Sequence, residues 1–182
     1  DLATGEVRWE METGGPIVGG PAVQDGVVYV GSDDGLLYAL DAQSGQEQWR
    51  FPTGDGIWST PLVPAAGGVV YLTSLDKKVY ALDASIGQKQ WDVSLGTREK
   101  IIGSLVVSQD TIFVAAGSRV YALESSSGKQ RWPKPFQAEG KIWSNLVLSQ
   151  DTLYFASLGH QVYAVNALNG EPRWPPFTTQ GA

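Results

Sequence analysis

An eleven-residue phrase ending in tryptophan returns at almost constant spacing along this chain of 182 residues. Each copy also carries a glycine four residues before its tryptophan. The tryptophans stand 40 to 42 residues apart, at Trp9, Trp49, Trp91, Trp132 and Trp174, and the copy that begins at Asp1 lacks its first residues. A period of about 40 to 45 residues is typical of repeat arrays. The chain is therefore predicted to be a tandem array rather than one irregular domain.

Each period contains four short runs of the kind that form β-strands. In the first complete period the runs are Ile17 to Val23, Val27 to Val30, Leu36 to Leu40 and Gln46 to Phe51, separated by turns rich in Gly, Asp and Ser. The middle runs are apolar throughout, as in covered strands, whereas the fourth is more polar, as at a sheet edge. We predict an all-β β-propeller of four-stranded antiparallel blades. A β-sandwich of unrelated strands would not explain the repeated turns.

The repeated phrase resembles the tryptophan-docking motif of pyrroloquinoline-quinone-type (PQQ-like) propeller repeats, Ala-x-Asp-x-x-x-Gly-Lys-x-x-Trp. Ala39, Asp41, Gly45 and Trp49 match it in the first complete copy, and the resemblance covers essentially the whole chain. Glu124 and Asn166 replace the aspartate in later copies, and both can still cap a turn. The resemblance implies structural docking residues at the blade boundaries, namely Trp9, Trp49, Trp91, Trp132 and Trp174. The last four close the complete copies of the phrase and are expected to be largely buried.

The repeats predict blades at residues 12–52, 53–94, 95–136 and 137–178. Residues 1–11 are expected to be the outer strand of a preceding blade and residues 179–182 to lead into a following one, as in a piece of a longer chain. The resembled family usually closes its ring with about eight blades, so four would make half a ring. We expect two copies to close an eight-bladed ring as a homodimer. The alternative is that four blades close alone.

Composition excludes several classes of function. The formal net charge is −6 and the sequence pI about 4.7, so the basic footprint of a nucleic-acid-binding protein is lacking. No apolar run is long enough for a membrane-spanning helix, so we expect no membrane insertion. The chain has no cysteine, hence no disulfide or thiolate metal site. No nucleophile elbow, phosphate loop or HExxH stretch occurs, and no catalytic residue is predicted.

Binding residues of a propeller are expected in the loops between blades and between the second and third strands, which open on one face. The blade-connecting loops are residues 13–16, 53–56, 96–100 and 137–141, and the hairpin loops are residues 32–35, 74–78, 117–119 and 157–160. The alternative is that their charged residues form only a solvated rim. A zinc site would need partners for the single histidine, and these are absent. The candidates for a ligand or partner face are Asp33, Asp34, Asp76, Lys77, Arg98, Lys100, Arg119, Lys141 and His160, beside Asp55, Glu99 and Glu139.

Two further tryptophans interrupt the repeat. Ile57-Trp58-Ser59 and Ile142-Trp143-Ser144 place Trp58 and Trp143 at the start of the innermost strand, where other repeats have Val18 and Ile102. Inner strands line the channel, so this pair could narrow it or stack on a guest. The alternative is that both rings pack beneath a neighbouring blade.

Two functions remain open. One is a non-catalytic binding or protein-interaction scaffold without a cofactor, similar to the outer-membrane assembly lipoprotein BamB or to sensor regions of bacterial kinases. This resemblance implies a periplasmic or other extracytoplasmic setting and a protein partner. The alternative is a fragment of a PQQ-dependent alcohol or glucose dehydrogenase, with the quinone between a tryptophan and adjacent cysteines near calcium. The absent cysteines weigh against it, and Asp33, Asp34 and Asn145 are the nearest, separated calcium candidates.

Overall fold

A computed structural model describes residues 3–103 and 105–179 of the chain. Within these residues all regular structure is β-strand. Most strands are three to six residues long, as expected from runs closed by glycine and aspartate turns. The strands are β1 (Ala22–Gln24), β2 (Val27–Gly31), β3 (Leu36–Asp41), β4 (Glu47–Pro52), β5 (Val69–Thr73), β6 (Lys78–Asp83), β7 (Lys89–Ser94), β8 (Leu105–Ser108), β9 (Thr111–Ala116), β10 (Arg119–Glu124), β11 (Phe136–Gln137), β12 (Val147–Ser149), β13 (Thr152–Ser157), β14 (Gln161–Asn166) and β15 (Phe177–Thr178).

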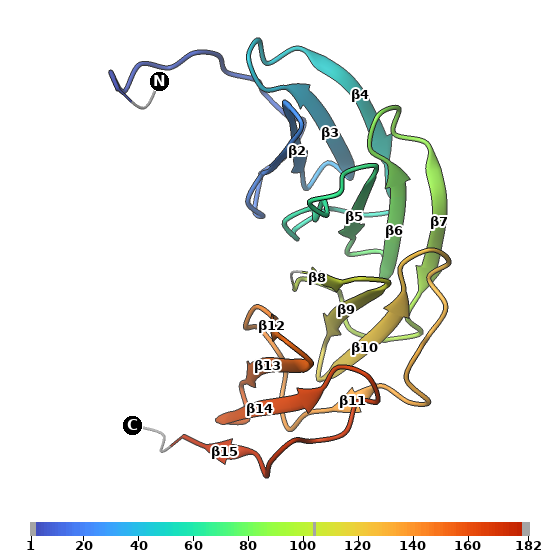
Figure 1. The fold of residues 1–182 in the computed structure, drawn as a ribbon. Coiled ribbons are helices and arrows are strands. Elements are labelled where there is room, and N and C mark those ends of the chain that lie inside the picture. The colour runs from blue at the N-terminus through green and yellow to red at the C-terminus, as the bar shows by residue number, and fades with distance from the viewer. Residues whose placement is uncertain (1–2, 104, 180–182) are drawn as a thin grey trace.

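The strands form four antiparallel sheets, in the orders β1-β2-β3-β4, β5-β6-β7, β8-β9-β10-β11 and β12-β13-β14-β15. Figure 1 shows the sheets side by side in an open arc, with the first strand of each sheet on the concave side and the last on the convex side. Both termini lie at the open side of this arc. The predicted β-propeller architecture, with about four blades, is confirmed.

Several strand predictions need correction, and proline explains most of them. The run from Ile17 to Val23 forms a strand only from Ala22, after Gly19, Gly20 and Pro21. The second sheet has three strands, and only the bridge between Leu62 and Tyr71 marks its innermost run, because Pro61 and Pro64 flank it. Proline lacks the N–H that a ladder needs, so inner and outer strands containing it shorten.

The outer strand expected over residues 1–11 would belong to a preceding blade, which the described residues do not include, so this expectation stays a prediction. Residues 3–11 form no strand, although Gly5 keeps the positive φ of 71° that the equivalent glycines adopt. No described strand lies beside this segment to supply a ladder partner. Asp1 and residues 180–182, which the repeats assign to the partial copy and the tail, lie outside the described residues.

Neighbouring sheets are joined through the repeated tryptophans. The indole Nε1 donates to a backbone carbonyl of the next sheet at 3.0 to 3.1 Å, in the pairs Trp9 with Ala42, Trp49 with Ala84, Trp91 with Ser125, and Trp132 with Ala167. Each ring also covers a glycine of that sheet. A Cβ added there would lie 2.5 to 2.8 Å from the ring at Gly45, Gly87, Gly128 and Gly170. Only a residue without a side chain fits under the indole.

Trp174 is the exception to this packing. The motif predicts four largely buried rings; Trp132 is 1% exposed, Trp49 and Trp91 are partly buried, and Trp174 is 38% exposed. The reason is that no described sheet follows the one that carries Trp174, so its ring has no glycine turn to cover. The burial of a repeated tryptophan therefore depends on the next sheet and not on its own phrase.

Candidate functional site: the loop face of the blades

The two sets of loops lie together on one face of the arc, as the repeats predicted. The amide of Asp33 in the first hairpin loop donates to Pro16 O in the loop before it at 2.9 Å. The carbonyl of Ser32 in the same hairpin loop accepts from Ile57 N in the following loop, also at 2.9 Å. Equivalent bonds join the later loops, including Ile142 N to Gly117 O at 2.8 Å. The first hairpin loop is thus held between the blade-connecting loops before and after it.

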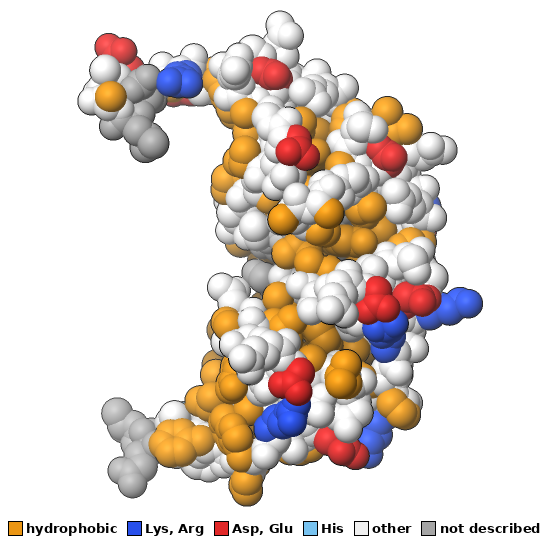
Figure 2. Space-filling view, viewed as in Figure 1, with side chains coloured by type: hydrophobic (Ala, Val, Ile, Leu, Met, Phe, Trp, Pro, Cys, Tyr) orange, Lys and Arg blue, Asp and Glu red, His pale blue; other side chains and the backbone are white. Residues whose placement is uncertain are grey.

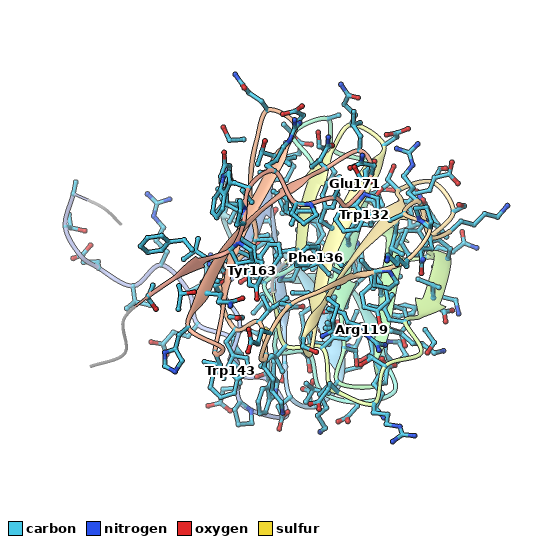
Figure 3. The ribbon with its side chains drawn as sticks, turned by 90° about the horizontal axis from the view of Figure 1, so that it is seen from below. Arg119, Trp132, Phe136, Trp143, Tyr163 and Glu171 are labelled. Atoms are coloured by element: carbon cyan, nitrogen blue, oxygen red, sulfur yellow. The ribbon has the colours of Figure 1, made fainter. Side chains whose placement is uncertain are left out.

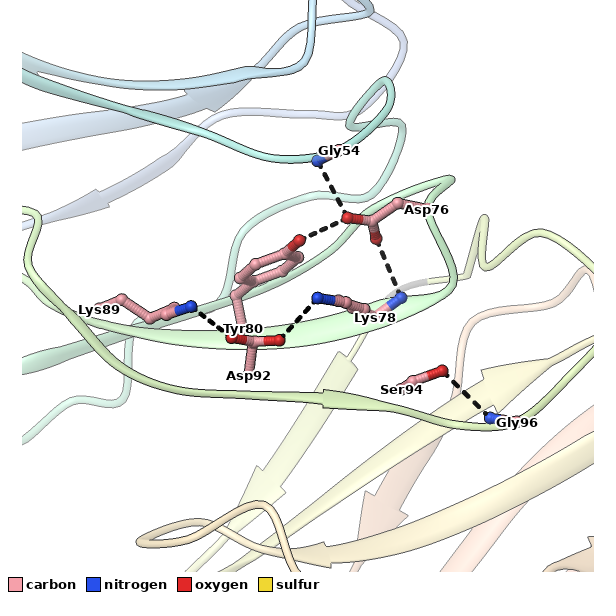
Figure 4. Close-up of polar contacts among 8 residues, drawn as sticks. All are labelled: Gly54, Asp76, Lys78, Tyr80, Lys89, Asp92, Ser94 and Gly96. Carbon is pink, nitrogen blue, oxygen red and sulfur yellow. Dashed lines mark hydrogen bonds and ion pairs between the residues drawn. The ribbon is translucent and has the colours of Figure 1, made fainter.

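Asp34 and Asp76 also connect a hairpin loop to the blade-connecting loop before it. Asp34 Oδ2 accepts from Gly14 N at 2.7 Å and from the Tyr38 hydroxyl at 2.8 Å, while Oδ1 accepts from Leu36 N at 2.9 Å. Asp76 repeats the arrangement with Gly54, Tyr80 and Lys78 (Figure 4). Burial raises the pKa of Asp34, but these hydrogen bonds outweigh it and hold the pKa below its ordinary value. Both carboxylates are occupied by the fold and are poor candidates for ligand binding.

Lys77 and His160 also have a local role. Their φ angles are 72° and 61°, and they stand at the turn position where the first hairpin has Gly35 with a φ of 83°. This left-handed conformation favours glycine, so both residues are strained turn positions. Neither lines the groove described below.

Ion pairs connect successive loops across the blades. Lys100 Nζ lies 3.4 Å from Asp55 Oδ2, and Lys141 Nζ lies 3.0 Å from Glu99 Oε2. All four side chains are about half exposed. Each such pair contributes about 1 kcal/mol or less to stability. These ion pairs stabilise the fold only weakly. Their main effect is to place positive and negative side chains next to each other along the loop face.

The two extra tryptophans do not start the innermost strands as predicted, but lie in short segments before them that are not strands. Ile57 and Ser59 are buried on either side of Trp58, and the Ser59 hydroxyl donates to Thr73 O at 3.1 Å. Trp143 is placed in the same way by the buried Ile142 and by Ser144, whose hydroxyl donates to Ala156 O at 3.0 Å. Alternate side chains of an extended segment point to opposite faces. The intervening indoles therefore point away from the packed side.

The environments of the two indoles differ. Trp58 is 38% exposed, and its Nε1 donates to Asp33 Oδ1 of the preceding loop at 2.6 Å. Trp143 is 63% exposed. The interpretation that both rings pack beneath a neighbouring blade is thus wrong for Trp143. Asp33, a predicted ligand candidate, is engaged by Trp58.

Trp143 borders a groove between the last two blades. The groove has a volume of about 330 Å³ and combines a partly apolar floor with a charged rim, its lining being Arg98, Glu99, Lys100, Ile102, Ala115, Gly117, Lys141, Ile142 and Trp143. Arg119 lines an adjoining hollow of about 290 Å³ together with Arg98 and Glu99. In Figure 3, Trp143 and Arg119 lie toward one end of the blades, whereas Trp132 and Glu171 lie toward the other.

The structure therefore brings together five of the predicted candidates, Arg98, Glu99, Lys100, Lys141 and Trp143, with Arg119 nearby. Sequence reasoning missed Ile102 and Ala115 as apolar lining residues. Ile102 could have been found, because it occupies the repeat position that holds Trp143 in the next blade. Ala115 lies within β9, where nothing in the sequence distinguishes it from other buried strand residues.

A family model described as outer membrane protein assembly factor BamB matches residues 1–102 and again residues 87–181. The chain belongs to this family. The two overlapping matches agree with the tandem blades, and the PQQ-like repeat is thereby confirmed.

Relatives of this BamB-family chain have different functions. A quinoprotein ethanol dehydrogenase of Pseudomonas aeruginosa is 41% identical over 64 residues, which are 35% of this chain and 10% of that protein. The serine/threonine-protein kinase AfsK of Streptomyces griseus is 34% identical over 73 residues, 37% of this chain and 9% of that protein. The crystal structure of BamB from Moraxella catarrhalis matches with a TM-score of 0.78 at 19% identity, over 93% of this chain and 55% of that one. The chain thus spans about a tenth of these curated relatives and about half of the solved structure.

The residues present do not fit a quinone and calcium centre. The chain lacks cysteine, and no group of three His, Cys, Asp or Glu suited to a metal ion occurs among residues 3–103 and 105–179. Asp33 accepts a hydrogen bond from Trp58, and Asp34 accepts one from Leu36 N of its own turn.

The described part of this BamB-family chain contains no helix with the length and apolarity needed to cross a membrane.

Proposed function

We propose that this chain is a non-catalytic binding module whose loop face holds a segment of a protein partner. The observation that supports this most is the exposure of Trp143 beside a groove with apolar and cationic walls. Exposed tryptophans and arginines are enriched at the energetic centres of protein interfaces. The family description, an assembly factor of the outer membrane, supports a protein partner in a periplasmic setting.

The groove favours a particular partner chemistry. Ile102, Ala115 and Trp143 offer apolar contact. Arg98, Lys100 and Lys141 carry one positive charge more than Asp55 and Glu99, which pair with the two lysines. This local excess of positive charge contrasts with the net charge of −6 for the chain. We therefore propose an extended peptide segment with an apolar side chain next to a carboxylate.

Peptide selection tests this proposal. A random peptide library displayed on phage is panned against the purified chain, and recovered peptides are measured by fluorescence anisotropy against Trp143→Ala. We expect acidic and apolar peptides whose affinity falls at least about tenfold in this variant, the loss of a typical interface anchor. Trp174→Ala is the matched control, since this exposed tryptophan lies outside the groove. Peptides that bind both variants equally would contradict the assigned site.

A second candidate, a fragment of a quinoprotein dehydrogenase, rests on the identity to the Pseudomonas aeruginosa enzyme. It is distinguished by titrating the chain with pyrroloquinoline quinone and calcium and following dye-linked oxidation of ethanol. Our proposal predicts neither tight quinone binding nor turnover. Micromolar quinone binding followed by turnover would replace it with the dehydrogenase.

A further inference from the structure

Two arginines of the loop face have no carboxylate partner in the described part of the chain. Arg98 takes part there in no ion pair or hydrogen bond, and Arg119 takes part in no ion pair. By contrast, Arg50, Arg131 and Arg173 are each paired with a carboxylate. Figure 2 shows blue and red side chains next to each other on the face in view. Arg98 and Arg119 therefore remain available to an anion from outside the chain.

Both arginines line the hollow of about 290 Å³ that adjoins the Trp143 groove. Arg98 belongs to the loop before the third sheet, and Arg119 begins β10 of that sheet. The hollow and the groove share Arg98 and Glu99 in their linings. A ligand that lies in the groove therefore passes directly beside the hollow.

The hollow is lined by hydrogen-bond donors that find no acceptor among the described residues. Gln137 Oε1 accepts from Arg119 Nε at 3.0 Å, which holds the side chain and leaves its two terminal nitrogens unused. Gln137 Nε2 donates to Ser118 Oγ at 2.8 Å, so the Ser118 hydroxyl can still donate its own hydrogen. Thr97 Oγ1 is in the same state, since it accepts from Glu99 N at 3.1 Å.

The two lysines beside the groove are less available than the arginines. Lys100 Nζ lies 3.4 Å from Asp55 Oδ2, and Lys141 Nζ lies 3.0 Å from Glu99 Oε2. An anion that bound either lysine would compete with a carboxylate already in place. Arg98 is thus the groove's cation without a partner in the described part of the chain.

The charge of the hollow favours a monoanion. Its charged lining residues are Arg98, Arg119 and Glu99, two cations and one anion. The cost of desolvating an anion rises with the square of its charge, whereas its attraction to an excess positive charge rises only in proportion. A carboxylate therefore fits better than a phosphate dianion. A guanidinium can also hold both carboxylate oxygens through two parallel hydrogen bonds.

We propose that the hollow between Arg98 and Arg119 binds the carboxylate of an acidic residue in the partner segment, while an apolar residue of the same segment contacts Trp143. Alternate side chains of an extended segment lie on one face. The recognised motif is therefore an apolar residue and a Glu or Asp separated by one residue. This inference rests on the proposed peptide-binding function and adds the residues that select the acidic position.

Two capped tripeptides test the carboxylate site. Acetyl-leucyl-seryl-glutamate amide and its glutamine counterpart differ only in the carboxylate, and each is titrated to millimolar concentration into the isotope-labelled chain by NMR. We expect the glutamate peptide to bind at least about tenfold more tightly and to shift the Nε–Hε signals of Arg98 and Arg119, because charge-assisted hydrogen bonds form only with the carboxylate. Equal binding of the two peptides, or no binding of either, would overturn the site.

Charge-matched variants assign the preference to the hollow. Arg98→Gln combined with Arg119→Gln should bring the two affinities to within about twofold of each other. Lys129→Gln combined with Lys134→Gln is the control, since these exposed lysines lie outside the hollow and the groove and the net charge changes equally. Circular dichroism checks that both variants retain β-structure. If the control removes the preference as well, the effect belongs to net charge and the site is overturned.

Trp143→Ala separates this inference from the proposed function. It should weaken both peptides alike and keep the glutamate preference, since the carboxylate contacts lie in the hollow. A preference that persists while Trp143→Ala changes neither affinity would refute the groove and leave the hollow. Dependence on Trp143 without a glutamate preference would refute the hollow alone.

Two further peptides identify the anion. One carries phosphoserine in place of glutamate, and the other is acetyl-leucyl-seryl-alanine with a free terminal carboxylate. We expect both to bind more weakly than the glutamate peptide. Tighter binding of the phosphoserine peptide would overturn the choice of a carboxylate, and tighter binding of the free-terminus peptide would overturn the choice of an acidic side chain.

Discussion

Replacing a docked tryptophan by alanine should unfold the arc at one blade boundary, and Trp132 gives the sharpest test. Its ring is 1% exposed, lies 5.6 Å from the ring of Phe113 and covers Gly170 of the next sheet. Truncating a buried tryptophan to alanine costs about 3 to 5 kcal/mol. The Ala167 carbonyl also loses its indole donor, which adds about 1 kcal/mol. We expect Trp132→Ala to lower the free energy of unfolding by about 4 to 6 kcal/mol.

The matched control is Trp174→Ala, which changes the same position of the same phrase. Trp174 is 38% exposed and covers no glycine among the residues that the structure describes, so its removal should cost less than about 1.5 kcal/mol. Urea unfolding is followed by far-ultraviolet circular dichroism at equal protein concentrations, because both variants change tryptophan fluorescence. Equal losses for the two variants would refute the argument that the next sheet, rather than the phrase, determines burial.

Three further changes test individual turns. Gly87→Ala should cost about 2 kcal/mol or more in urea unfolding, because the residue has a φ of 69° and its Cβ would lie 2.5 Å from the Trp49 ring; a neutral result would contradict this packing. His160→Gly should raise stability by about 1 kcal/mol by relieving a φ of 61°, and a lower melting temperature would argue against strain there. Asp34 has a lowered pKa in the folded state, so its contribution is complete above its ordinary pKa of about 3.9 and disappears as the pH falls through the lower folded value. Asp34→Asn should therefore flatten the acid side of the stability profile, and an unchanged profile would exclude this role.

The fold could be predicted closely because its signals are local and repeated. Glycine and aspartate turns, β-branched runs and the tryptophan spacing lie within one period and recur in each blade. The failures were also local in origin. Pro61, Pro64, Pro175 and Pro176 remove ladder donors, and sequence periodicity does not show how far a strand shortens around them.

The candidate site was harder to predict from charge alone. Asp34 and Asp76 were proposed as ligand residues because they are acidic and lie in loops, yet their oxygens are used by backbone amides and tyrosine hydroxyls across the turn. The sequence also favours Lys77 and His160 because they are basic residues in the same loops, yet both occupy strained turn positions. A carboxylate that binds a ligand and one that caps a turn look alike until their partners are known.

The sequence by itself determined the repeat, the blade architecture and the glycine that each indole requires, because these depend on contacts that recur with the period. Only the tertiary structure decided which copies of the same residue are buried. Trp132 and Trp174 close the same phrase, but Trp132 covers Gly170 whereas Trp174 has no following sheet to cover. Likewise, Trp58 binds Asp33 while Trp143 stands exposed beside the groove. Burial and exposure arise from neighbouring elements, and in an open arc the first and last blades lack neighbours that the middle blades have.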